Sequence, residues 1–146
     1  MSQLAHEGVA VVAPGNTYIG KQGFTCGAGA SRETVGAAHV CMNVLPMPAG
    51  AIAKAHYHEG IETIAYMLGG ECVVHFGPDL EKSVLVRTGE HCFVAADVPH
   101  APQNASDQAC TWLVVHSSGS DQDGIVLLPA LAAQLARKVK KTTLRG

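Results

Sequence analysis

Short apolar segments alternate with glycine, proline and polar residues along most of the chain, with a break about every ten positions. The segments are rich in Val, Ile, Cys, Phe and Thr, and β-branched and aromatic residues favour the pleated, half-buried surface of a strand. Evenly spaced short strands with turn signals between them are typical of an all-β sandwich or barrel. The pattern predicts antiparallel strands, and it lacks the long helical segments of a parallel α/β sheet. The predicted strands cover residues 38–45, 51–58, 62–68, 71–76, 82–87, 91–95 and 110–116.

Two regions depart from this strand pattern. Residues 14–36 contain six glycines, and we expect an irregular or β-structured arm there. Near the other end, Leu131 and Leu135 stand four residues apart among strong helix formers that follow Pro129. Proline is tolerated in the first helical turn, so this segment predicts one short C-terminal helix. We therefore expect a single domain with an arm (1–37), a barrel core (38–118) and a C-terminal segment with the helix and a basic tail (119–146).

Composition limits the partners of the protein. The 146 residues fit one domain, and 47% hydrophobic with 15% charged residues is typical of a packed globular chain. The net charge of −2 leaves no basic surplus to neutralise phosphates, so we expect no nucleic-acid partner. Half of the Lys and Arg residues lie within 137–145, which we interpret as a solvated tail. No apolar run has the length of a membrane span, so we also expect no membrane partner.

The cysteines indicate a reducing compartment. There are five of them, an odd number, and no two have the spacing of a CxxC motif. All except Cys26 lie in apolar or strand-like segments, which predicts reduced and mostly buried thiols. Residues 1–7 lack the basic and apolar regions of a secretion signal. We therefore expect a cytoplasmic protein.

A group of potential metal ligands is the main chemical feature. His56 and His58 are separated by one residue, so on a strand their side chains share one face. Glu62 opens the next predicted strand, and His100 follows a distant Val-Pro pair. Imidazoles and carboxylates are ligands of divalent transition metals, and this set leaves coordination positions open for a substrate, water or oxygen. The spacing predicts a metal site.

Tyr66 and the remaining histidines are considered next. Tyr66 shares a strand face with Glu62 and is a candidate proton donor, but we favour an ordinary packing role for it. We therefore assign no catalytic residue. The remaining histidines have no comparable spacing, and we expect ordinary surface or core roles for them. They are His6, His39, His75, His91 and His116.

Two sets of positions resemble the signatures of the cupin superfamily. The first set is Gly50, His56, His58, Glu62 and Gly69, with Gly70 as an alternative match for its last glycine. The second set is Gly89, His100 and Asn104. Ala95 and Asp97 depart from the second signature, because the family usually has Pro and Gly there. These two positions shape a turn and are not ligands, so the departure concerns the geometry of the loop.

The resemblance covers residues 50–104 and implies a fold, a cofactor and a function. The implied fold is a small antiparallel jelly-roll β-barrel that forms a homodimer. The implied ligands are His56, His58, Glu62 and His100, which bind one divalent transition metal per chain: Fe, Mn, Ni, Cu, Co or Zn. We expect a metal-dependent enzyme that acts on a small oxygen-rich molecule, such as an enolised diketone or a catechol, in a dioxygenase-type reaction. The alternatives are a non-redox isomerase, cyclase, lyase or decarboxylase, and a non-catalytic binding protein for a small molecule.

Overall fold

The computed structural model describes the backbone of residues 6–145 and the side chains of residues 6–140. Residues 1–5, at the start of the predicted arm, and 146, at the end of the basic tail, lie outside the described part. The described strands are β1 (Thr17–Ile19), β2 (Thr25–Ala30), β3 (Cys41–Met47), β4 (His56–His58), β5 (Thr63–Gly69), β6 (Glu71–Phe76), β7 (Lys82–Arg87), β8 (His91–Val94), β9 (His100–Gln103), β10 (Cys110–His116) and β11 (Ile125–Leu127). The helices are α1 (Arg32–Val35) and α2 (Pro129–Arg145).

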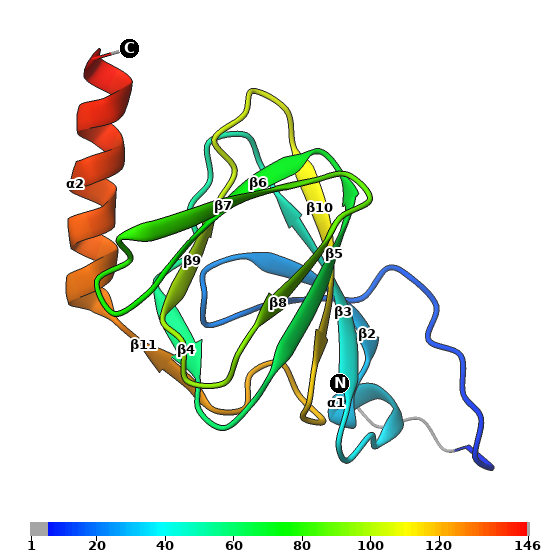
Figure 1. Cartoon of the computed structure of the whole chain (residues 1–146). Coiled ribbons are helices and arrows are strands. Elements are labelled where there is room, and N and C mark those ends of the chain that lie inside the picture. Colours follow the sequence, from blue (N-terminus) through cyan, green and yellow to red (C-terminus); the bar gives the residue numbers. More distant parts are fainter. Residues whose placement is uncertain (1–5, 146) are drawn as a thin grey trace.

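The strands form two antiparallel sheets that face each other (Figure 1). The first sheet has the order β1-β2-β3-β10-β5-β8, and the second has the order β11-β4-β9-β6-β7. Strands close in sequence are distributed over both sheets, so the chain crosses repeatedly between them. The predicted all-β barrel with a C-terminal helix is confirmed.

The two-residue periodicity of the strands determines what lies between the sheets. In β5, Thr63, Ala65 and Met67 are buried, whereas Ile64 and Leu68 point outward and are exposed. The central strand β10 pairs with β3 on one side and β5 on the other. The inward residues of these strands and of β6 and β7 pack as one apolar core: Met47, Ala65, Met67, Cys72, Val74, Val86, Cys110 and Trp112.

The glycine-rich segment forms regular structure, in the strands β1 and β2 and the single turn α1. At Gly29, an added Cβ atom would lie 1.9 Å from the carbonyl oxygen of Met42 on β3. Only glycine allows the two backbones to approach so closely. The glycines that suggested an irregular arm thus permit β2 to pack against β3.

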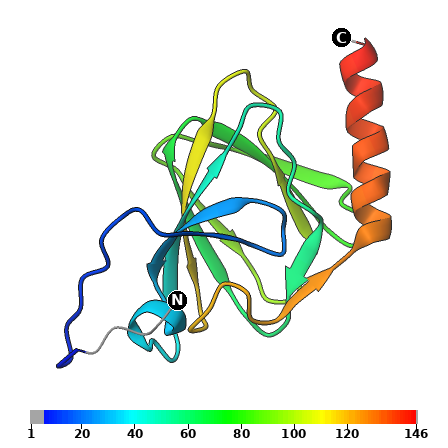
Figure 2. The ribbon, with the colours of Figure 1, turned by 180° about the vertical axis from the view of Figure 1, so that it is seen from behind.

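The C-terminal helix α2 confirms the helix predicted after Pro129. Leu135 is buried and packs in a second apolar cluster with Ala55, Leu80 and Ala101. The helix stands beside the barrel, on the side opposite the segment that precedes β1 (Figure 2). No helix in the described part of the chain is long and apolar enough to cross a membrane.

Candidate metal centre

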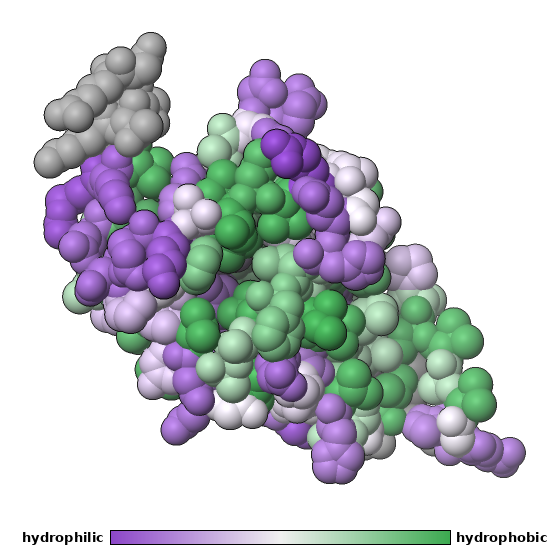
Figure 3. Space-filling model, viewed as in Figure 1, coloured by the Kyte–Doolittle hydropathy of each residue, from purple (hydrophilic) through white to green (hydrophobic). Residues whose placement is uncertain are grey.

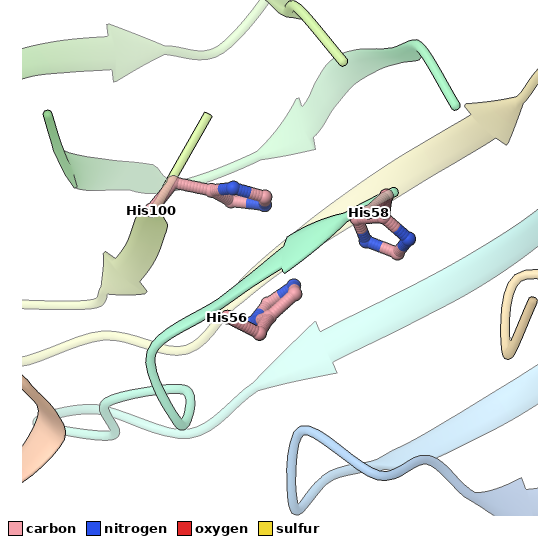
Figure 4. A group of neighbouring side chains, drawn as sticks. All are labelled: His56, His58 and His100. Atoms are coloured by element: carbon pink, nitrogen blue, oxygen red, sulfur yellow. The ribbon is translucent and has the colours of Figure 1, made fainter. Parts of the chain in front are cut away.

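Three of the predicted ligands converge between the two sheets. His56 and His58 come from β4, and His100 comes from β9, where it is the pairing partner of His56. All three side chains are buried, and each offers a ring nitrogen within 4.8 Å of the others (Figure 4). The ring centroids of His56 and His100 lie 4.4 Å apart. Because β4 and β9 pair directly, the register of the sheet brings residues from distant parts of the sequence into one cluster.

Backbone carbonyls set the protonation of two of these rings. The Nδ1 atom of His56 lies 2.7 Å from the carbonyl oxygen of Lys54, and that of His100 lies 2.9 Å from the carbonyl oxygen of Val98. A carbonyl oxygen only accepts hydrogen bonds, so both Nδ1 atoms are donors. We infer that each Nε2 atom keeps its lone pair. Metal-binding histidines commonly have this arrangement, in which the ring nitrogen that does not bind the metal donates a hydrogen bond to a nearby acceptor.

Burial keeps the histidines in the neutral form that binds metals. Burial, followed by the neighbouring ring of His100, lowers the pKa of His56 to about 3. Burial also lowers the pKa of His58 to about 3, where the rings of His116 and His100 add to the effect. The pKa of His100 is lowered by burial as well. Three neutral imidazoles are therefore available near pH 7 without loss of a proton.

The structure places Glu62 outside this cluster, with its side chain exposed. Glu62 precedes β5, and the inward positions of that strand begin at the next residue, Thr63. The alternative glycine of the first signature explains the difference. At Gly70, φ is +87° and an added Cβ would lie 2.7 Å from the Cβ of Cys110, whereas nothing crowds Gly69. When the signature is counted back from Gly70, Thr63 falls at the ligand position instead of Glu62.

His116 joins the site, although the sequence suggested only an ordinary role for it. It is buried at the end of β10, and its ring centroid lies 4.6 Å from that of His58. Its Nδ1 atom lies 2.8 Å from Oγ1 of Thr63, the residue opposite it on β5. Burial lowers the pKa of His116 to about 4. The sequence contained one usable signal, because strand alternation from Trp112 places His116 on the core face.

The histidines line a cavity of about 90 Å³ between the sheets. A single water needs about 10–15 Å³ of such space, so the cavity has room for several waters or a small organic molecule. Tyr18 and Asp121 also line it, and the Tyr18 hydroxyl donates a hydrogen bond to the Asp121 carboxylate. Burial, followed by this contact, raises the pKa of Tyr18. Nothing in the sequence pattern pointed to this pair.

Tyr66 does not line the cavity. It lies on the outward face of β5, where its ring packs against His91 with 4.8 Å between the centroids. The packing role expected for Tyr66 therefore agrees with its position.

The chemistry of the donor set fits a divalent transition metal. Three neutral imidazoles that converge in a cavity match the nitrogen ligands that Zn, Cu, Fe and Ni accept. His58 differs from the other two rings, because its buried Nδ1 atom makes no well-formed hydrogen bond with the described residues, although the backbone of Asp123 lies near the ring. Three protein ligands leave at least one coordination position open toward the cavity.

A Glu62→Gln variant tests whether the carboxylate contributes to the site. Because the side chain is exposed and outside the cluster, we expect the metal content and affinity of the variant to match those of the parent within about twofold. Metal titration followed by plasma mass spectrometry measures both. A loss of about tenfold or more would restore Glu62 as a ligand.

Comparisons with known proteins agree with the fold. No curated protein sequence matches the chain significantly. Among solved structures, an uncharacterised conserved protein with a double-stranded β-helix domain from Klebsiella pneumoniae is similar, with a TM-score of 0.56 and 16% identity over 62% of this chain and 76% of that one. At that identity the likeness concerns the fold alone.

Two solved enzymes are also similar. Oxalate oxidase in complex with the substrate analogue glycolate has a TM-score of 0.55 and 25% identity, covering 62% of this chain and 47% of its own. The DMSP lyase DddQ from Ruegeria pomeroyi has a TM-score of 0.52 and 26% identity, covering 62% of this chain and 44% of its own. The matched region is thus less than half of each enzyme chain.

A family model described as "Cupin domain" matches residues 43–116. This range is about half of the chain and includes His56, His58, His100 and His116. Together with the two facing antiparallel sheets, the match confirms the jelly-roll fold and the resemblance found in the sequence. The chain belongs to the cupin family.

Proposed function

We propose that this cupin is an enzyme that binds one divalent transition metal through His56, His58 and His100 and acts on a small oxygen-rich molecule. The observation that supports this most directly is the convergence of three buried, neutral imidazoles in one cavity. An oxygen-dependent reaction of the dioxygenase type is the function that we favour. Similarity to oxalate oxidase supports oxygen chemistry on a small, oxygen-rich substrate.

A metal bound there would polarise a substrate oxygen as a Lewis acid and, if redox-active, would also allow oxygen chemistry. The residues around the metal site orient the histidine rings and limit the access of water. The Lys54 and Val98 carbonyls orient two ligand rings, and Thr63 orients His116 beside them. Apolar side chains from both sheets, such as Val114 on β10 and Val74 on β6, line most of the remaining cavity and limit the access of water.

A lyase or another non-redox metal enzyme is the second candidate. Similarity to the DMSP lyase supports it, because that enzyme has the same fold and a comparable identity to this chain. The histidine cluster suits both kinds of chemistry, since the metal that such a site binds depends on geometry and metal availability as much as on ligand type. The metal is therefore one of Fe, Mn, Ni, Cu, Co or Zn in this proposal.

We also propose that the protein forms a homodimer. Apolar side chains gather on the face of the molecule where β5, β7 and β8 lie (Figure 3). The exposed ones are Ile64, Leu68, Val84, Leu85 and Phe93. Exposed apolar side chains of this kind support contact with a second copy. The five free cysteines support a reducing location such as the cytoplasm.

The first experiment is a metal analysis of tag-free protein, followed by oxygen-uptake assays with small carboxylates, diketones and catechols. Near-stoichiometric metal with substrate-dependent oxygen uptake is the expected result. Turnover of a substrate without oxygen uptake would favour the non-redox enzyme. If ligands shift the melting temperature but no substrate is turned over, the chain is a binding protein. Failure to bind any of the six metals on reconstitution would refute the metal site.

A further inference from the structure

A second hollow lies against the histidine cavity. This groove has a volume of about 620 Å³ and is lined by residues of β6, β7 and β8 and by the segment 95–100. Four residues line both the groove and the cavity: Val74, Cys92, Val94 and His100. Because His100 belongs to the histidine cluster, the groove borders the metal centre itself.

The groove lies where the two sheets end. β8 is the last strand of the first sheet, and β7 is the last strand of the second (Figure 1). In the described part of the chain, β7 pairs with β6 alone and β8 pairs with β5 alone. The two sheets are therefore not joined by a strand ladder along this side of the barrel.

The inward face of β7 is open to solvent at this edge. Val84 and Val86 are two residues apart on the strand, so their side chains share one face. Val86 belongs to the apolar core and is 5% exposed, whereas Val84 is 46% exposed. Val84 also lies opposite Val74, a buried residue that lines the cavity. An inward position that stays exposed indicates an opening between the sheets.

The inward residues of β8 border the same opening. Cys92 and Val94 lie opposite Ala65 and Thr63 on β5, and both of these β5 residues are buried. Residues directly opposite each other on paired strands point to the same side of the sheet. Cys92 and Val94 are nevertheless only half-buried. Exposure of the inward positions therefore rises from β5 to the edge strand β8, where the groove meets the cavity.

Another part of the cavity wall is held shut by the N-terminal arm. Tyr18 on β1 and Asp121, which precedes β11, both line the cavity, and the Tyr18 hydroxyl donates a hydrogen bond to the Asp121 carboxylate. The backbone N–H of Lys21, between β1 and β2, donates to the side-chain oxygen of Gln122 over 2.8 Å. These contacts fasten the arm to the loop before β11, so the edge between β7 and β8 is the less obstructed route.

We propose that small oxygen-rich substrates reach the histidine cluster through the opening between β7 and β8, and that Val84 borders this passage. The class of substrate rests on the proposed function. The opening itself does not depend on a bound metal, because strand edges and exposed inward residues form it. Failure of the passage and failure of the metal site can therefore be distinguished.

Diethyl pyrocarbonate tests the passage, because this small reagent acylates neutral imidazoles and so reports which histidines it reaches. It is applied to the metal-free full chain, and mass spectrometry of peptides measures the rate of modification. The clustered histidines should react more slowly than the exposed His39, but at a measurable rate. In Val84→Trp we expect the rate at the cluster to fall at least about tenfold, which corresponds to ~1.4 kcal/mol of added barrier. No reaction at the cluster of the parent would overturn the passage.

Leu85→Trp is the matched control. Leu85 is the next residue and is also exposed, but its side chain lies on the other face of β7 and does not line the groove. This variant should keep the parental rates at the cluster, and it also controls for altered contact with a second copy. Equal rates at the cluster in the two tryptophan variants would overturn the proposal.

Two further measurements complete the test. If Val84→Trp does not fold, Val84→Ala widens the opening instead and should raise the rate at the cluster at least about twofold, the effect of a small decrease in the barrier. An unchanged rate would contradict the proposal. Zinc should protect the clustered histidines of the parent. If zinc gives no protection but Val84→Trp slows the reaction, the passage stands and the metal site fails. If zinc protects and Val84→Trp has no effect, the metal site stands and the passage fails.

Discussion

Replacing His58 with Ala is expected to abolish stoichiometric binding of a divalent transition metal. The variant loses one of three clustered imidazoles, and the two that remain cannot complete the site. Loss of an outer partner of a metal ligand alone costs about 10–100-fold in affinity, so loss of the ligand itself should cost more than about 100-fold. Metal titration, with plasma mass spectrometry of the dialysed protein, measures the effect. The β-sheet circular dichroism should be largely retained.

His39→Ala is the matched control for this variant. His39 is exposed and lies outside the histidine cluster, so its removal tests the effect of losing any histidine. The control should bind metal as the parent does. If His58→Ala binds metal with the parent affinity, the cluster is not the metal site.

The metal-free protein is expected to lose several kcal/mol of unfolding free energy between pH 6.5 and about pH 4. The folded-state pKa is about 3 for His56 and His58 and about 4 for His116, against an ordinary value of 6.5. Below pH 6.5 the unfolded chain therefore binds more protons than the folded one. Stability is fully present above pH 6.5 and falls as the pH decreases toward the folded pKa values. Each such histidine contributes up to about 1.4 kcal/mol per pH unit in this window.

Urea unfolding at several pH values measures this slope, and His116→Gln isolates the part due to one residue. We expect the slope near pH 5 to decrease by about one proton, or about 1.4 kcal/mol per pH unit. His39→Gln, at an exposed position, should leave the slope unchanged. Equal slopes for the parent and His116→Gln would show that His116 is not buried in its neutral form.

The local pattern of apolar and polar residues was sufficient to predict most of the strands. The predicted segments 71–76, 82–87 and 110–116 coincide with β6, β7 and β10, because their alternating or apolar residues match a two-residue repeat. β9 and β11 were not predicted. β9 contains Pro102, which usually argues against a strand, and it exists because β4 and β6 pair with it on either side. β11 has three residues and depends on its pairing with β4.

The shared orientation of the two histidines on β4 also follows from local strand geometry. Two side chains separated by one residue share a face on any strand, so His56 and His58 had to point the same way. Whether Glu62 points inward depends on which residues of β5 occupy the inward positions. A shift of one residue exchanges the two faces of a strand. In the sequence, the signature can end at either of two adjacent glycines, Gly69 or Gly70, so the inward positions could not be assigned. The crowding of Gly70 against Cys110 resolves this assignment, and such crowding exists only in the folded molecule.

The amino-acid sequence alone was enough to predict the fold class, the C-terminal helix, the family resemblance and the shared face of two histidines. These features depend on backbone geometry and on spacing within one segment. Two features depended on the tertiary structure: His116 joins the cluster, and Glu62 stays outside it. Each of these depends on which strands become neighbours and in what register. Long-range pairing sets that register, and no local pattern in the chain encodes it.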